Sequence, residues 1–111
     1  MNKVVALNSE TMGAGSEELG KQLIGGFLRK LWNQPTKPRT IVFYNSGVNI
    51  LVEGFPALDA LEGLFKAGVD LVACGTCCDY YDIKDKLRVG RISDMQEITS
   101  LLMNADNVIT I

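Results

Sequence analysis

Three cysteines lie within five positions of this 111-residue chain, and they are the residues best able to do covalent chemistry. Cys74 and Cys77 enclose a Gly-Thr pair, in the spacing of redox-active and sulfur-handling proteins, and Cys78 follows directly. The reactive form of cysteine is the thiolate, which free N–H groups at a helix start stabilise, and Gly75 lets such amides approach closely. Because the chain has no histidine, an imidazole cannot activate the nucleophile, and we predict a helix-stabilised thiolate in this motif.

The same cysteines leave other interpretations open. A thioredoxin-type disulfide pair has this spacing, but thioredoxins carry it early and rely on a later cis-proline, whereas all prolines here precede the cysteines. A zinc ion would receive three thiolates at most, and the adjacent Cys77 and Cys78 are poorly spaced to ligate one ion together, so we expect no metal. Free cysteines also pack as small hydrophobic residues, and in that role the three would do no chemistry.

Two other loops carry candidate binding residues. Gly13 begins a Gly-Ala-Gly sequence like that of a dinucleotide-binding loop, but Glu18 stands where a third glycine belongs and, with Glu17, would repel a phosphate. We therefore expect no nucleotide and no other cofactor. The Asn-Ser-Gly sequence at residues 45–47 is typical of a turn, and its amides and side chains could also line a pocket facing Cys74.

Apolar runs separated by turn residues predict alternating strands and helices. Buried strands are predicted at residues 4–7, 40–44, 69–73 and 108–111. Helices are predicted after an N-cap at Ser16, from Pro56 to Gly68, over Asp79 to Leu87 and after a cap at Ser93 or Asp94, with a brief strand or extended connection at 88–90. Side chains expected to pack inward include Leu19, Leu23, Ile24, Phe27, Leu28, Leu31 and Phe65. Tyr80 and Tyr81 are also expected to pack, with a hydroxyl that reaches the site as the alternative.

This alternation predicts an α/β fold, a three-layer doubly wound domain whose mainly parallel sheet has about five strands. At this length we expect a single domain over residues 1–111. Ligands of such folds gather at the carboxyl ends of the strands, where the loops after the first three strands meet. The predicted pocket residues from these loops are Met12, Gly13, Asn45, Ser46, Gly47, Gly75 and Thr76.

Composition excludes several partners. The net charge is −2 and the basic residues are scattered, so we expect no nucleic acid. No apolar run approaches the length of a membrane span, so we expect no membrane contact. Clustered cysteines in an odd number do not suit a secreted, disulfide-stapled protein, and we therefore expect the protein to be cytoplasmic.

The order of motifs resembles the DsrE/DsrF-like family, and in particular the C-terminal domain of YedF-type proteins associated with selenium metabolism. Five segments carry this resemblance: 9–13 (Ser-Glu-Thr-Met-Gly), 43–48 (Phe-Tyr-Asn-Ser-Gly-Val), 74–77 (Cys-Gly-Thr-Cys), 87–90 (Leu-Arg-Val-Gly) and 108–111 (Val-Ile-Thr-Ile). The similarity runs nearly end to end. It implies a DsrE-like α/β homo-oligomer of the sulfur-relay group.

By this resemblance Cys74 falls on the position that carries sulfur as a persulfide, and Cys77 on the second cysteine of the YedF-like branch. The implied function is that of a sulfurtransferase or persulfide carrier, with catalytic Cys74 and Cys77 and a sulfur-donor protein such as a TusA-like domain as partner. Cys78 lies outside the family pattern and has no assigned role. A non-catalytic oligomeric binding or scaffold module, and a thiol-disulfide oxidoreductase, are the alternatives.

Overall fold

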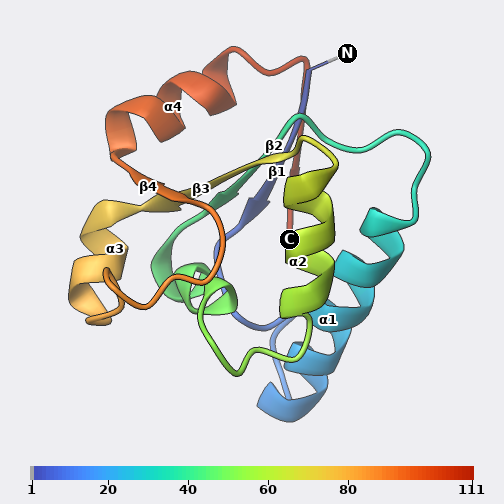
Figure 1. Ribbon diagram of the computed structural model, residues 1–111, viewed down its shortest axis with the longest axis vertical. Helices are drawn as coiled ribbons and strands as arrows, with labels where there is room; N and C mark the ends of the chain where they lie inside the picture. Colours follow the sequence, from blue (N-terminus) through green and yellow to red (C-terminus); the bar gives the residue numbers. More distant parts are fainter. Residues whose placement is uncertain (1) are drawn as a thin grey trace.

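The computed structural model describes residues 2–111 as one five-stranded sheet with helices packed on it (Figure 1). The strand order is β4-β3-β2-β1-β5, and all neighbouring strands pair in parallel. The predicted α/β fold with a parallel sheet of five strands is therefore confirmed. The strands are β1 (Lys3–Leu7), β2 (Thr40–Phe43), β3 (Asp70–Cys74), β4 (Arg91–Ser93) and β5 (Asn107–Thr110).

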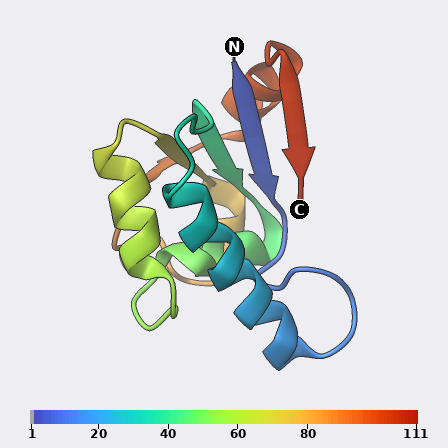
Figure 2. The ribbon, with the colours of Figure 1, turned by 90° about the vertical axis from the view of Figure 1, so that its right-hand side faces the viewer.

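Helices cover the sheet on both faces, because successive strand residues point to opposite sides. Val5 and Leu7 of β1 pack in one core cluster with α1 and α2, whereas Val4 and Ala6 pack in a second with α4. Figure 2 shows α1 and α2 together on one side of the sheet, with α4 beyond the other. The helices are α1 (Glu17–Trp32), α2 (Leu58–Lys66), α3 (Gly75–Tyr80) and α4 (Met95–Met103).

Helix α1 begins as predicted, because the hydroxyl of Ser16 accepts a hydrogen bond from the N–H of Leu19 at 3.1 Å. Its buried face agrees with the prediction only in part. Ile24 and Leu28 are buried as predicted, whereas Leu19 and Leu23 are 52% and 45% exposed, and Gly20 and Gly25 are buried in their place. The small residues decide this orientation, since a Cβ on Gly20 would lie 2.5 Å from the Cβ of Thr11.

The segment after β2, where the sequence at residues 45–47 is typical of a turn, forms a 3-10 helix, η1 (Asn45–Leu51). Helix α2 follows, beginning two residues after Pro56 rather than at it. Gly68 ends this helix in a left-handed conformation with φ of +97°, as its predicted position after the C-cap requires. Phe65 is 54% exposed, so its predicted inward orientation is wrong.

The segment after β3 departs most from the prediction. Helix α3 starts at Gly75, directly after Cys74, instead of spanning Asp79 to Leu87. It starts early because the thiol of Cys78, one turn in, is fully buried in the core. The short strand β4 lies at 91–93 rather than at 88–90, because Gly90 turns the chain first, with φ of +90°.

Helix α4 is capped by the second of the two predicted residues. The Asp94 carboxylate accepts a hydrogen bond from the N–H of Glu97 at 2.9 Å. The Glu97 carboxylate in turn accepts two hydrogen bonds of 2.8 Å from Arg91 and one from the hydroxyl of Ser93. This cluster fixes the start of α4 to the edge strand β4.

The cluster predicts an acid dependence of stability. Hydrogen bonds from Arg91 and Ser93 lower the pKa of Glu97 from 4.5 to about 2. The stabilisation is therefore complete above about pH 4.5 and is lost as the pH falls towards 2. In urea unfolding, the stability difference between the native protein and Glu97→Gln should shrink over this range. The difference in stability should be modest, because the side chains of Arg91 and Glu97 are 45% and 38% exposed. A difference that does not change with pH would show that Glu97 is not the titrating group.

No helix within residues 2–111 is long and apolar enough to cross a membrane.

Candidate functional site

Cys74 ends the buried strand β3 and is the N-cap residue of α3. It is only 2% exposed and packs on the α4 face of the sheet with Val42 and Val72. In the parallel ladder it pairs with Ser93 of the edge strand β4. The strand end therefore holds this thiol at the carboxyl edge of the sheet, as predicted. The thiol is buried there rather than exposed to solvent.

Cys77 lies one turn into α3 and is half-buried. Its Sγ accepts a hydrogen bond from the backbone N–H of Asn45 at 3.1 Å, and its side chain packs against the buried cluster that contains Cys74. Burial raises the pKa of Cys77, the Asn45 N–H lowers it, and Cys74 raises it further. The net shift is upward, so Cys77 stays protonated at neutral pH and is suited to donate its proton to the Cys74 sulfur.

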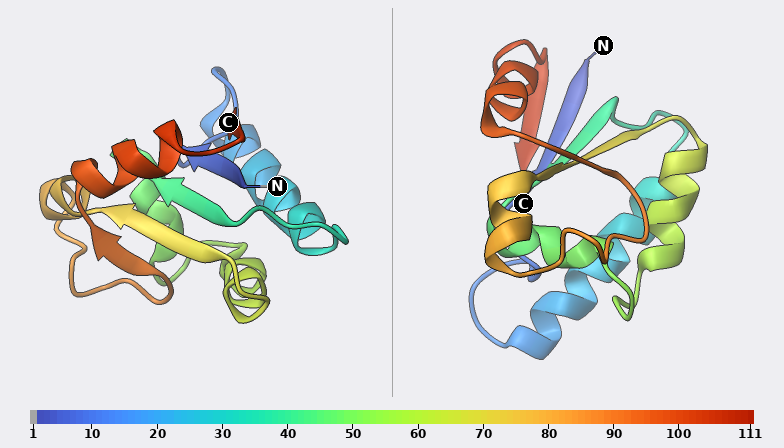
Figure 3. Two further views of the ribbon diagram at one scale, coloured as in Figure 1. Left: turned by 90° about the horizontal axis from the view of Figure 1, so that it is seen from above. Right: turned by 60° about the vertical axis from the view of Figure 1, so that its left-hand side comes forward.

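Asn45 aims its N–H at this thiol because its backbone is left-handed, with φ of +51°. Asparagine tolerates this conformation better than most residues. The hydroxyl of Tyr81 donates a hydrogen bond of 3.3 Å to the Asn45 side-chain oxygen and so supports the turn from α3. Figure 3 shows η1 and α3 side by side at the end of the sheet, in agreement with these two bonds.

The predicted stabilisation of Cys74 by the start of α3 is not observed. Its side chain makes no capping hydrogen bond with the helix. The backbone of Gly75 lies against β4 instead, where an added Cβ would be 3.0 Å from the carbonyl oxygen of Ser93. Cys74 interacts instead with the thiol of Cys77, whose pKa it raises.

A pocket of about 410 Å³ opens beside Cys77. Tyrosines from three positions form much of its wall, namely Tyr44, Tyr80 and Tyr81, and the rest comes from Asn45, Thr76, Cys77 and Met95. Tyr80 stands at the rim with 83% of its surface exposed, so its predicted packing role is wrong. The edge of its ring meets Tyr81 at a centroid distance of 5.1 Å. The result is an uncharged, largely aromatic cavity next to one thiol of the pair.

Cys78 points away from this pocket into the core beneath α1 and α2. It is fully buried, and burial raises its pKa. The described residues, 2–111, contain no group of three cysteine, histidine or acidic side chains arranged to hold a metal ion. Cys78 is therefore a packing residue in this fold.

The structure brings only some of the predicted pocket residues to Cys77. Asn45 and Thr76 line the cavity, whereas Met12 packs on the core of the opposite face. Gly13 is exposed with φ of +82°. The hydroxyl of Ser46 accepts a hydrogen bond from the N–H of Glu10 at 3.3 Å, which ties the loops after β1 and β2 together. These loops support the pocket. The lining residues absent from the predicted set are Tyr44, Tyr80, Tyr81 and Met95.

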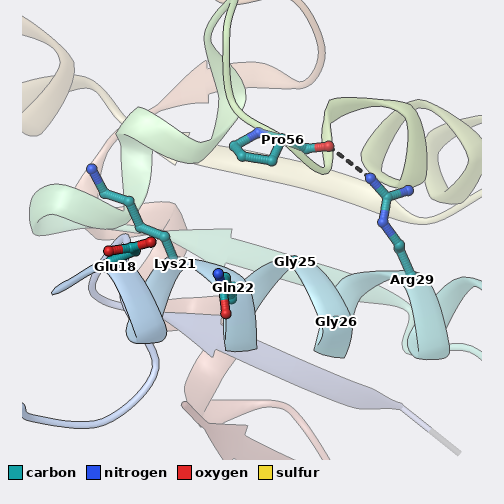
Figure 4. A pocket seen from close by; sticks show the side chains of 7 residues that line it. All are labelled: Glu18, Lys21, Gln22, Gly25, Gly26, Arg29 and Pro56. Carbon is teal, nitrogen blue, oxygen red and sulfur yellow. Dashed lines mark hydrogen bonds between the residues drawn. The ribbon is translucent and has the colours of Figure 1, made fainter. Parts of the chain in front are cut away.

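A second cavity, of about 480 Å³, lies on the other side of the molecule, between α1 and Pro56. Figure 4 shows Arg29 extending from α1 to the chain at Pro56, and Lys21 extending from the same helix in a different direction. Arg29 is held by Asp59 at 2.8 Å and by the Pro56 carbonyl at 2.7 Å, and Lys21 by Glu10 at 3.2 Å. Both cations that line this second cavity are therefore paired. None of its lining residues is a cysteine, so the cavity lacks a group for covalent chemistry.

The arrangement predicts how Cys77 reacts with alkylating agents. Because its pKa is raised, its alkylation by iodoacetamide should be slow at neutral pH and should accelerate up to a midpoint above pH 9.0. Replacing Cys74 by alanine removes one cause of the raised pKa, so the midpoint should move to lower pH. Peptide mapping after timed alkylation measures both effects. A midpoint that does not move would mean that the two thiols do not interact.

Comparison with known proteins supports the fold and the family. The chain is similar over all of both chains to the crystal structure of the ychN protein from E. coli, with 21% identity and a TM-score of 0.74. A protein of unknown function from Methanobacterium thermoautotrophicum is similar over the same extent, at 20% identity and a TM-score of 0.70. A third such protein, from Bacteroides thetaiotaomicron, shares 15% identity over 99% of this chain and 95% of its own, with a TM-score of 0.65.

No curated protein matches the chain. The model of the DsrE/DsrF-like family matches residues 27–111, which contain β2 to β5 and all three cysteines. This match covers most of the chain and confirms the predicted family. The chain belongs to the DsrE/DsrF-like family.

Proposed function

We propose that this protein is a persulfide carrier or sulfurtransferase of a sulfur relay, in which Cys74 holds the transferred sulfur. The DsrE-like family is linked to sulfur relay in general. The observation that carries the narrower proposal is the position of the Cys77 thiol between the buried cluster that contains Cys74 and an uncharged pocket. In this scheme the Cys77 thiol donates to the Cys74 thiolate and stabilises the nucleophile that the chain cannot activate with histidine.

The burial of Cys74 fits storage of a labile group. A persulfide at a site that is 2% exposed is shielded from reductants in the solvent. A donor enters through the pocket and meets Cys77 first, so the Cys77 side chain moves aside before Cys74 reacts. Reaction therefore requires a rotamer change at Cys77, a motion that half-buried side chains make readily.

The second step uses Cys77 as a resolving thiol. Cys77 loses its proton to solvent and its sulfur attacks the inner sulfur of the Cys74 persulfide; an S–S bond forms between the two cysteines, and hydrosulfide leaves with the electron pair of the broken bond. The resulting disulfide is reduced by a cellular dithiol. We infer a sulfur-donor protein such as a TusA-like domain as partner, acting on a cytoplasmic homo-oligomer of this single DsrE-like domain. Selenium would follow the same steps, as the narrower YedF-type prediction implies.

A thiol-disulfide oxidoreductase is the second candidate, and the packing of Cys77 against the cluster that contains Cys74 favours it. It would cycle between dithiol and disulfide without ever holding sulfane sulfur. A non-catalytic binding module is the third candidate, and it would use the pocket alone.

Intact-mass spectrometry separates the three functions. Reduced protein is incubated with benzyl persulfide, separated from the donor and weighed. Sulfur relay predicts the added mass of one sulfur atom at early times, which dithiothreitol removes and which later gives way to the loss of two hydrogen atoms as Cys77 resolves the persulfide. A disulfide oxidoreductase predicts the loss of two hydrogen atoms with no sulfur adduct at any time, and a binding module predicts an unchanged mass. Either of the last two results would overturn the proposal.

A further inference from the structure

We propose that the pocket beside Cys77 selects an uncharged organic persulfide with an apolar or aromatic body, in preference to an anionic sulfur donor. This inference rests on the proposed function and names the substrate class of the same site. Sulfane sulfur reaches proteins either in inorganic anions such as thiosulfate or on the thiol of an organic molecule. The two classes need opposite surroundings, because a buried anion must be paired whereas an apolar body must be covered.

The pocket wall has the composition that suits an apolar body. Tyr44 and Tyr81 supply aromatic surface, Met95 supplies a flexible thioether, and Tyr80 extends the aromatic surface past the rim. No lining residue carries a charge. Its volume of about 410 Å³ lies within the range of small-molecule sites.

The basic side chains between α3 and α4 are mostly engaged elsewhere. Lys84 pairs with Asp79 at 3.1 Å, Arg88 pairs with Glu53, and Arg91 is held by two carboxylates. Lys86 is the remaining base of this segment, and it does not line the pocket. An anionic donor would therefore find no cation on the wall to compensate for its lost hydration.

A carboxylate stands next to one rim residue in the chain. Asp94 precedes Met95, whereas the charge of Asp79, which precedes Tyr80, is paired with Lys84. The backbone N–H groups at the start of α3 can compensate little of the charge of an anionic donor, since the carbonyl oxygen of Ser93 lies against Gly75. Both features add negative potential where an anionic donor would have to approach.

The transfer from such a donor is balanced without an oxidant or a reductant. The Cys74 thiolate attacks the outer sulfur of R–S–SH, and a new S–S bond forms on Cys74. The bond between the two donor sulfurs breaks, and its electron pair leaves with R–S⁻. The proton stays on the transferred sulfur, so the products are the Cys74 persulfide and the donor's thiolate.

Two donors that differ by one charge test this selection on the intact protein. Benzyl persulfide and 4-carboxybenzyl persulfide are compared by timed intact-mass measurement, with each rate divided by the rate at which the same donor loads free cysteine. We expect the uncharged donor to load the protein about tenfold faster after this correction, because the carboxylate loses part of its hydration in the pocket. Equal corrected rates, or a faster carboxylate, would overturn the inference. If neither donor loads the protein, the proposed function itself fails.

Two methionines of α4 give a matched pair of variants. Met95 lines the pocket and is 50% exposed, whereas Met103 is 78% exposed and lies at the far end of the helix. Met95→Lys places a cation at the rim and should reduce or reverse the preference for the uncharged donor. Met103→Lys adds the same charge away from the pocket and should leave the preference unchanged. A preference that Met95→Lys does not alter would show that the pocket does not set it.

Discussion

Cys74→Ala is expected to abolish the persulfide that the native protein acquires from benzyl persulfide. The substitution removes the sulfur atom that forms the new bond, and no neighbouring thiol has the same surroundings. Cys77 remains, but its pKa is raised and its side chain is half-buried rather than covered. Any persulfide formed there is open to the pocket and to reductants. Intact mass after removal of the donor should therefore show unmodified protein. A sulfur adduct as abundant as in the native protein would remove Cys74 from the carrier role.

Cys78→Ala is the matched control for this experiment. It deletes a thiol from the same helix, but one that points into the core beneath α1 and α2. The variant loses some stability, about 1 kcal/mol for a small buried side chain, and should load sulfur normally. Thermal unfolding of both variants shows whether each remains folded at the loading temperature. Loss of loading in Cys78→Ala alone would exchange the roles of the two residues.

Cys77→Ala distinguishes storage from release. Without the resolving thiol, the Cys74 persulfide cannot close to a disulfide, and its lifetime in the absence of an external reductant should lengthen. The measurement is the decay of the sulfur adduct together with the hydrosulfide released. A decay rate equal to that of the native protein would mean that Cys77 does not resolve the persulfide.

The sequence alone was sufficient to predict the position of the cysteines. Strands β1, β2 and β3 are runs of β-branched and apolar residues, buried on both faces, and this pattern needs no tertiary information. The rule that chemistry gathers at the carboxyl ends of parallel strands then led to Cys74. The order of the elements was predictable for the same reason.

The start of α3 was not predictable from local preferences. Gly75 and Thr76 are poor helix formers, and glycine after a strand normally indicates a turn. The helix begins there because burial of Cys78 fixes the chain one turn later. Likewise, the apolar stripe of α1 included Leu19 and Leu23, whereas the sheet accepts the helix on the side of Gly20 and Gly25. Tertiary packing overrode the local signal in both segments.

The hydrogen bond from Asn45 to Cys77 joins segments that no spacing rule connects. It depends on a left-handed backbone at Asn45 and on the contact between η1 and α3. An asparagine in a turn after a strand indicated that Asn45 could belong to the site. Nothing in the sequence indicated that its partner would be Cys77. Tyr81 carried no comparable signal, because tyrosines in short helices usually pack.

Gly47→Ala is expected to be the most destabilising small substitution near the site. A Cβ at this position would lie 2.1 Å from the carbonyl oxygen of Leu7. That oxygen cannot move aside, because β1 is the second strand from the β5 edge, between β5 and β2, and the oxygen accepts a hydrogen bond from the N–H of Tyr44 at 3.2 Å. We expect the free energy of unfolding to fall by about 3 kcal/mol, the upper range for overpacking. The strain also reaches Asn45 two residues earlier, so the alkylation profile of Cys77 should change in any variant that folds.

Two other glycines show that the backbone contact, and not the added methyl group, causes this cost. A Cβ on Gly63 would also lie 2.1 Å from its nearest neighbour, but that neighbour is the ring of Trp32, which is 39% exposed and can swing outwards. Gly63→Ala should therefore cost less than Gly47→Ala. Gly26, in the middle of α1, has no atom within 4 Å of an added Cβ, and Gly26→Ala should stabilise the helix by about 1 kcal/mol. Urea unfolding of the three variants measures this order. If Gly47→Ala proved no worse than Gly63→Ala, the close approach of η1 to β1 would not be the feature that holds Asn45 over Cys77.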